Sequence, residues 1–408
     1  MLAELDPEHA VMLFDVLRAA SLWAADDGAA GWYDPKLLRR WEKAILTGHL
    51  DEHLRSAAGV LIGELVHPET SDPRQLSMCC LQISEWALGR GAVETSIEFN
   101  RLAALVWPTN ARLAYVTGRR YGSVCRFKDS DIWLRRAARI ARWYADWEAF
   151  ADALTSIGML AYRQGNIPRA RSFLDRALRV ARRRGLRQLE GEILHDRFTV
   201  AFTSNEKTDA EALARAAYQR YLPSHERLPA LAYDIAYYWL TRGYAARALP
   251  VLRLLRAHFP QPAAQFQVLC ASARAAGALH DRTAFRAIWA EANDLMYVAQ
   301  SSPVFGIALI DLGYGAAHLG DWVHAEAAFL RAAKAAPGKD QGEDRLLAEA
   351  ALEAVRRREN PDPLPLRRVE AETTELGRAL VLHLSGSGSA GNAAGRDVRP
   401  PQGPGGGQ

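Results

Sequence analysis

The sequence contains little lysine and little cysteine, and each shortage removes an interpretation. Only 6 of its 51 basic residues are lysine, so arginine and alanine dominate in a way that GC-rich coding alone produces. The arginine content by itself is therefore no evidence for a nucleic-acid partner. The four cysteines, Cys79, Cys80, Cys125 and Cys270, have neither the C-x-x-C spacing nor the partner histidines of a metal site. We expect them to be buried free thiols in a reducing cytoplasm.

Long hydrophobic runs are missing as well. No apolar stretch approaches the roughly 20 residues that a helix needs to cross a bilayer. The first 20 residues, which include Asp6, Glu8 and His9, are typical of an amphipathic helix and not of a signal peptide. These observations predict a cytoplasmic protein without a membrane contact.

Sequence motifs that carry catalysis are also missing. The chain has no phosphate-binding loop G-x-x-x-x-G-K-[ST], no H-E-x-x-H helix and no dinucleotide fingerprint after a strand. Two His–Asp pairs, at 195–196 and 280–281, are the kind of ligands that a metal hydrolase uses, but such a site needs further ligands around the same ion. One pair falls within a predicted helix and the other at a predicted turn. We therefore expect no metal, no cofactor and no enzymatic activity.

What the sequence does contain is a helical repeat, clearest between residues 305 and 337. Small residues at fixed spacing allow two antiparallel helices to approach, an aromatic residue fills the space between them, and glycine or proline ends each helix. These positions are Leu312, Gly313, Ala316, Gly320, Ala325, Phe329, Ala332 and Pro337. The segment resembles a tetratricopeptide (TPR) repeat.

The same template can be laid along most of the chain. If Gly313 is the close-packing anchor of the first (A) helix of a pair, equivalent anchors fall at residues 84, 118, 158, 198, 236, 273 and 313, which are 34, 40, 40, 38, 37 and 40 residues apart. The TPR period is about 34 residues, so this array is degenerate. Because one helix pair cannot bury both of its apolar faces, each pair stacks on the next. The predicted fold is all-α, a right-handed superhelical solenoid of antiparallel helix pairs.

The regions outside the array have different compositions. Residues 1–70 are predicted to form an N-terminal helical cap, with helices at 8–25, 35–46 and 51–66, and a DNA-reading helix-turn-helix around 37–61 is an alternative for part of it. The array with a C-terminal capping helix spans 71–358. Residues 359–384 are predicted to form an extended linker that contains a short apolar run, either a strand or a docking segment. Residues 385–408 are rich in Gly, Ser and Pro and are predicted to be disordered.

The A helices are expected to line the inner groove of the solenoid. In each unit, three residues of the A helix are expected to face this groove. They lie three residues before the anchor, one residue after it and five residues after it. Tyrosine and arginine are the residues that binding hot spots favour, and the resemblance to TPR proteins implies a peptide or protein ligand there. The arginines suit an acidic segment or a C-terminal carboxylate, whereas the alternative is that several tyrosines only pack across adjacent A helices. The candidate residues are Tyr115, Arg119, Arg163, His195, Tyr233, Tyr237, Thr241, Arg274, Tyr314 and His318.

Positive charge is concentrated between residues 112 and 187. This stretch holds 18 Lys and Arg against 6 Asp and Glu, although the whole chain carries a net charge of only +4. Three interpretations remain open: a solvated outer face of the second (B) helices, a surface for an acidic protein, or a nucleic-acid surface.

These observations lead to two functional hypotheses. The first is a non-catalytic scaffold that binds a peptide or protein segment in the groove of a TPR-like solenoid. The second is a sensor or regulatory protein of a bacterial signalling or transcription-control system that acts through a partner, since no effector domain is evident.

Overall fold

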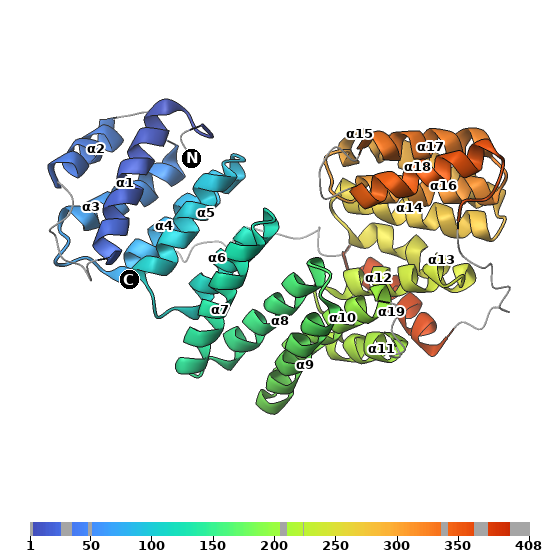
Figure 1. The fold of residues 1–408 in the computed structure, drawn as a ribbon, viewed down its shortest axis with the longest axis horizontal. Coiled ribbons are helices and arrows are strands. Elements are labelled where there is room, and N and C mark those ends of the chain that lie inside the picture. Colours follow the sequence, from blue (N-terminus) through green and yellow to red (C-terminus); the bar gives the residue numbers. More distant parts are fainter. Residues whose placement is uncertain are drawn as a thin grey trace, which may run out of the picture. The chain divides into compact units, whose positions relative to one another are not determined.

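The computed structural model describes residues 3–25, 35–47, 51–204, 210–222, 224–335, 342–362 and 374–391. All regular structure in these residues is helical, and no strand occurs among them. The chain divides into two compact units, unit 1 from Met1 to Lys207 and unit 2 from Thr208 to Gln408. The prediction of an all-α chain built from antiparallel helix pairs is confirmed (Figure 1).

Both units are built from successive helices. Unit 1 contains α1 (Pro7–Ala25), α2 (Pro35–Thr47), α3 (Glu52–Val66), α4 (Pro73–Gly89), α5 (Val93–Val106), α6 (Ala111–Ser123), α7 (Phe127–Trp143), α8 (Trp147–Arg163), α9 (Ile167–Arg184) and α10 (Arg187–Thr203). Unit 2 contains α11 (Ala210–Tyr221), α12 (Leu228–Thr241), α13 (Ala245–Leu255), the 3₁₀ turn η1 (Arg256–His258), α14 (Pro262–Ala278), α15 (Arg282–Ala299), α16 (Phe305–His318), α17 (Trp322–Ala335), α18 (Gly342–Arg356) and α19 (Glu375–Gly391). Among these described helices, none combines the length and the apolar character that crossing a bilayer requires.

Local sequence determines where many of these helices begin. Asp51, Asn110 and Asp146 each stand immediately before a helix, and their side-chain oxygens accept hydrogen bonds from backbone amides of its first turn. Such caps satisfy amide groups that have no partner within the helix, and each stabilises it by about 1 kcal/mol. Helix starts could therefore be located from the sequence to within one or two residues.

At three of the anchors, a glycine allows the A helix to lie directly against its B helix. A Cβ atom placed on Gly313 would lie 2.7 Å from ring atoms of Phe329, which no real side chain tolerates. The aromatic ring therefore occupies the space that a larger anchor residue would fill. The same spacing of sixteen residues joins Gly118 to Leu134, Gly158 to Leu174 and Gly313 to Phe329.

The turn between the two helices of a pair also follows one pattern. The residue seven positions after the anchor has a left-handed backbone, with φ between 57° and 84°. Glycine adopts this conformation at little cost, whereas for other residues it is less favourable by about 1–2 kcal/mol. In the described turns of the array these residues are Gly91, Cys125, Gly165, Gly243, His280 and Gly320.

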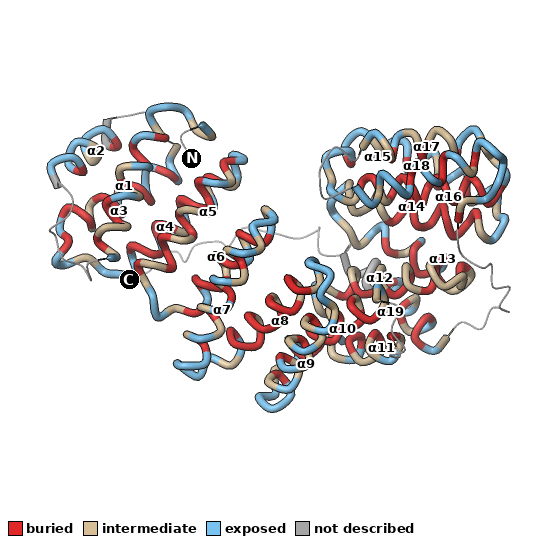
Figure 2. The backbone as a smooth tube through the Cα atoms, in the orientation of Figure 1, coloured by how far each residue is buried: buried red, intermediate tan, exposed pale blue. Residues whose placement is uncertain are grey.

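In unit 2, the A helices α14 and α16 approach so closely that their backbones touch. A Cβ on Gly315 would lie 2.5 Å from the carbonyl oxygen of Ala273, and Gly277 meets the backbone of Gly315 even more tightly. Most residues along both helices are buried (Figure 2). This glycine contact brings the side chains of α14 and α16 within hydrogen-bonding distance of one another.

The region after the array differs from the extended linker and disordered tail expected for 359–384 and 385–408. Residues 375–391 form α19, and 392–408 lie outside the described residues. Leu376, Leu380 and Leu384 recur every fourth position on one side of this helix and are at most 3 % exposed. The helical period becomes visible only when Leu376, which precedes the apolar run 379–384, is included.

Helix α19 is held against α11 and α13 by both apolar and polar contacts. The hydroxyl of Tyr218 donates to the carbonyl of Ala379 at 3.2 Å, and Arg215 pairs with Glu375 at 2.9 Å. The carbonyl of Leu384 lies 3.1 Å from His258 Nε2. The helix is therefore an integral part of unit 2.

Candidate functional site

In unit 1, the structure pairs two of the predicted groove residues. Tyr115 is buried, and the guanidinium carbons of Arg112 and Arg119 lie 4.9 and 5.9 Å from its ring centroid. Arg163 is exposed, and its Nη1 donates to the carbonyl of Gly122 at 3.4 Å. The tyrosine is thus a packed residue with cationic neighbours, which agrees with the alternative that some tyrosines pack across helices.

Two other predicted residues, His195 and Thr241, are buried and half-buried respectively. His195 of α10 is only 3 % exposed. Thr241 of α12 bonds from Oγ1 to the carbonyl of Tyr238 at 3.0 Å, a bond within its own helix.

The remaining five predicted residues of unit 2 converge around Arg274 of α14. This arginine is 5 % exposed and makes a two-bond fork to Asp362, with Nε to Oδ2 at 2.9 Å and Nη2 to Oδ1 at 2.7 Å. The third nitrogen, Nη1, donates to Oδ1 of Asp311 on α16 at 2.8 Å. Forked arginine–carboxylate pairs of this kind are among the stronger polar interactions in proteins.

Asp311 connects this arginine to α12. The hydroxyl of Tyr237 donates to Oδ1 of Asp311 at 3.4 Å. Burial raises the pKa of Asp311 to about 6, although Arg274 pulls in the opposite direction. Burial, together with the neighbouring Asp311 charge, raises the pKa of Tyr237 above its usual value. Tyr237 therefore acts as a neutral donor to the carboxylate.

Asp362 reaches the site from the segment that follows α18. Arg358 takes a left-handed backbone with φ of 58°, which reverses the chain after the helix, and the amide of Asp362 then bonds to Oδ1 of Asn360 at 3.1 Å. Nε2 of His318 donates to Asp362 Oδ2 at 3.0 Å, and Nδ2 of Asn360 lies 3.1 Å from His318 Nδ1. Burial opposes ionisation of Asp362, but the His318 bond and the Arg274 charge outweigh it and lower its pKa.

Aromatic rings flank these charges. Tyr233 and Tyr237 stack with centroids 5.8 Å apart on α12, and the guanidinium carbon of Arg274 lies 4.7 Å from the ring centroid of Tyr314. Burial raises the pKa of Tyr314 to about 12. We name the group of Tyr233, Tyr237, Arg274, Asp311, Tyr314, His318, Asn360 and Asp362 the Arg274 cluster.

Sequence reasoning missed three members of the cluster, namely Asp311, Asn360 and Asp362. One signal could have found Asp311, because it is the only ionised group in the otherwise apolar helix sequence FGIALIDLGYGAAH, apart from the terminal histidine. A carboxylate inside such a helix needs a cation. The position of Asp362 depends on a chain reversal that no local pattern predicts.

The charged groups of the Arg274 cluster are paired and buried. Its arginine and two aspartates are all engaged with one another, and both carboxylates are buried. No group of three or more His, Cys, Asp or Glu that could hold a metal ion occurs among the residues that the structure describes.

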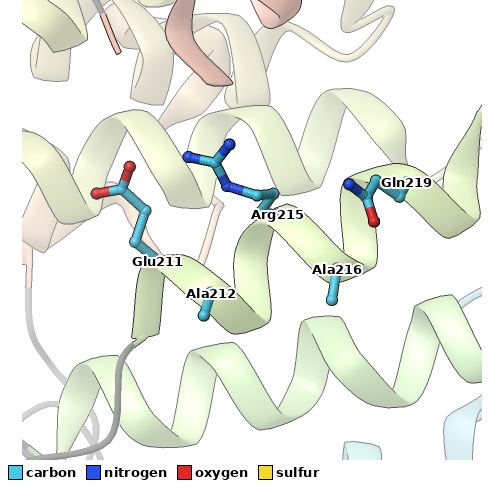
Figure 3. Close-up of a pocket in the computed structure, with 5 residues that line it drawn as sticks. All are labelled: Glu211, Ala212, Arg215, Ala216 and Gln219. Carbon is cyan, nitrogen blue, oxygen red and sulfur yellow. The ribbon is translucent and has the colours of Figure 1, made fainter. Parts of the chain in front are cut away.

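Open pockets lie elsewhere on the chain. One of about 350 Å³ runs along α11 and is lined by Glu211, Ala212, Arg215, Ala216 and Gln219 (Figure 3). Glu211, Arg215 and Gln219 project to one side of the helix and the two alanines to the other. None of the predicted groove residues lines it.

The arginines of residues 112–187 are largely placed on exposed helix faces. Several are paired within unit 1, for example Arg135 with Asp131 at 2.6 Å and Arg112 with Asp152 at 2.6 Å. Burial, with repulsion from Arg139, lowers the pKa of Arg136. The ion pairs with Asp131 and Asp152 reduce the positive charge that residues 112–187 offer to a partner. They favour the interpretation that these arginines form a solvated outer face.

The chain matches no protein-family model and no curated protein sequence. Solved structures do match it. Aspartyl phosphate phosphatase F from Bacillus subtilis aligns with a TM-score of 0.52 at 13 % identity over 81 % of this chain and 95 % of that chain. This likeness concerns the fold, an array of helices, and at such low identity it extends no further.

Two further solved structures align more weakly. A Rap protein complexed with Competence and Sporulation Factor aligns with a TM-score of 0.42 at 12 % identity, over 86 % of this chain and 98 % of that one. The Rap conjugation gene regulator of the plasmid pLS20, in complex with the Phr* peptide, aligns with a TM-score of 0.35 at 12 % identity, over 94 % and 98 % of the two chains. Both TM-scores are too low to bear on this chain.

Proposed function

We propose that this protein binds a peptide or protein segment through one face of unit 2. This face contains the predicted groove positions of α12, α14 and α16, and we call it the A-helix face. The observation that carries the proposal is the Arg274 cluster. Residues from three successive A helices converge there on one arginine, and aromatic rings flank it. Arginine and tyrosine at the centre of a desolvated site are what binding hot spots favour.

The array itself supports a binding role. The repeated anchor and turn geometry makes us infer a degenerate TPR array, in which neighbouring pairs are coupled through their interfaces. Binding would then be an equilibrium association without a chemical step. A regulatory role through a partner is the second possibility, because such an array has no effector of its own.

The phosphatase name of one structural match makes an enzymatic alternative testable. We propose no catalysis, because the carboxylates of the Arg274 cluster are occupied by their cation. Incubation with a phospho-aspartyl protein should therefore leave its rate of dephosphorylation unchanged. An acceleration that depends on Asp311 would support the enzymatic alternative.

The binding proposal is tested by affinity capture from the native host with mass spectrometry. The variant Tyr233→Ala/Tyr237→Ala removes the stacked rings of the A-helix face, and Tyr297→Ala serves as a matched control because that tyrosine is 80 % exposed on α15. We expect the double variant to lose a partner that the wild type and the control retain. Circular dichroism must show that all three are folded, and equal capture by all three would contradict the proposal.

A further inference from the structure

One of the two carboxylates bound to Arg274, that of Asp362, comes from the segment after α18 and not from the helices of the array. Asp311 lies on α16, as the fold requires, but Asp362 follows the last array helix, α18, and reaches back to α14. Eighty-eight positions separate it from Arg274. The array could therefore form its helix pairs without this contact.

The segment holds Asp362 in a preformed shape. The left-handed Arg358 reverses the chain, Pro361 fixes the backbone before Asp362, and the side chain of Asn360 bonds both to the Asp362 amide and to His318. The two carboxylate oxygens of Asp362 then accept three hydrogen bonds, two from Arg274 and one from His318. A carboxylate held in this way has the contacts that a bound acidic ligand would have.

Charge balance allows one carboxylate to replace another. If Asp362 leaves, Arg274 stays paired with Asp311, while its Nε and Nη2 donors lose their acceptor. A neutral ligand would leave these buried donors unsatisfied, which is costly. A ligand that supplies a carboxylate restores both bonds, so exchange costs little.

Resting on the proposed function, we propose that the Arg274 fork is a recognition site for an aspartate or glutamate side chain of the bound segment, and that Asp362 occupies it in cis as a built-in competitor. The side chains of Arg274 and Asp362 are 6 % and 2 % exposed. An external carboxylate therefore reaches the fork only after residues 359–362 have moved. The apparent affinity equals the affinity of the open site multiplied by the fraction of molecules in which the site is open.

The test uses the full chain and a synthetic probe. The probe is a fluorescein-labelled peptide with the sequence of residues 359–365, Glu-Asn-Pro-Asp-Pro-Leu-Pro, amidated at its C-terminus. Fluorescence anisotropy compares its binding to the wild type and to Asp362→Ala. We expect Asp362→Ala to bind the probe at least about tenfold more tightly, because its fork is open.

Three controls make the result specific. A probe with Asn in place of Asp and Gln in place of Glu, which we call the Asn probe, should bind neither protein. Arg274→Lys in the Asp362→Ala background, which keeps the charge but loses the fork, should weaken binding of the Asp probe. Glu359→Ala, an exposed position in the same segment, should bind the probe as the wild type does. The Asn probe with a free C-terminal carboxylate, in place of the amide, should bind no better than the amidated Asn probe. This result would show that the fork selects a side-chain carboxylate.

Folding is checked by circular dichroism and thermal melting. If Asp362→Ala does not fold, Pro361→Gly is used in its place, because this variant loosens the segment and keeps the Asp362 carboxylate. We expect Pro361→Gly to bind the probe more tightly than the wild type does. The proposal is overturned if the folded variant binds the Asp and Asn probes equally, or binds neither. If the proposal is overturned in this way, capture of a partner that depends on Tyr233 and Tyr237 would still support the proposed function. If instead the Asp probe binds as expected but no such partner is captured, only the proposed function is contradicted.

Discussion

Arg274 is the residue on which the charge balance of unit 2 depends. Its removal would leave Asp311 buried without a counter-charge and Asp362 with only its bond from His318, and breaking a buried ion pair in this way costs about 3–5 kcal/mol. We expect Arg274→Ala to lower the free energy of unfolding by about that amount, measured by urea denaturation. Arg119→Ala is the matched control, since Arg119 holds the same repeat position in α6 but is exposed. Equal, small losses in both variants would mean that the buried pair is not formed.

Asp311 should make stability depend on pH. Burial raises its pKa from 3.8 to about 6, so the folded protein binds this proton more tightly than the unfolded chain does. The resulting contribution is complete below the unfolded pKa and is lost as pH rises through about 6. A shift of this size corresponds to at most about 3 kcal/mol.

The measurement compares wild type with Asp311→Asn by chemical denaturation from pH 5 to 7.5. We expect the stability of the wild type, relative to the variant, to fall as pH rises across this range. Asp362 has a lowered pKa, so its own loss of stability begins only below 3.8, outside this window. A relative stability that stays constant or rises with pH would contradict the assignment.

At the scale of the helices, close packing at the anchors should control stability. A Cβ on Gly313 would meet the Phe329 ring at 2.7 Å, so Gly313→Ala should destabilise unit 2 by about 1–3 kcal/mol through overpacking. Gly63 lies inside α3, and a Cβ there would meet no atom within 4 Å, so Gly63→Ala should stabilise by about 0.5–1 kcal/mol. Thermal melts of both variants check the two signs, and the same sign in both would refute the packing argument.

Helix α19 should behave as part of the core of unit 2. Leu380 is 1 % exposed, whereas Leu382 of the same helix is 76 % exposed. We expect Leu380→Ala to lower the free energy of unfolding by about 2–4 kcal/mol and Leu382→Ala to change it by less than about 0.5 kcal/mol. Similar small effects in urea denaturation would show that the helix does not dock in solution.

Much of this helical arrangement could be predicted because its signals are local. Anchor glycines such as Gly158 and Gly313 and capping residues such as Asp51 act within one helix pair, so a single stretch of sequence contains them. The positions of Asp311 and Asp362 could not be predicted, because they depend on the distance between α14 and α16 and on the turn at Arg358. For the same reason, Arg274 and His318 were placed on the correct helices, but their burial could not be predicted.

At the scale of the whole molecule, the two units offer different chemistry. Unit 1 carries the arginine-rich stretch 112–187, in which part of the charge is paired internally, and unit 2 carries the Arg274 cluster. Binding through unit 1 should weaken strongly as salt rises, because exposed charges are screened. Binding through the buried fork of unit 2 should depend less on salt.

The affinity of the captured partner for two variants tests the central claim most directly. Isothermal titration should show that Tyr233→Ala/Tyr237→Ala weakens binding by about 1–3 kcal/mol per ring, whereas Asp362→Ala strengthens it. These opposite signs follow only if the A-helix face binds the partner and Asp362 competes for the same arginine. Affinities that are unchanged in both variants, but lost when Arg139 and Arg142 are replaced by Glu, would contradict this account and place the partner on unit 1.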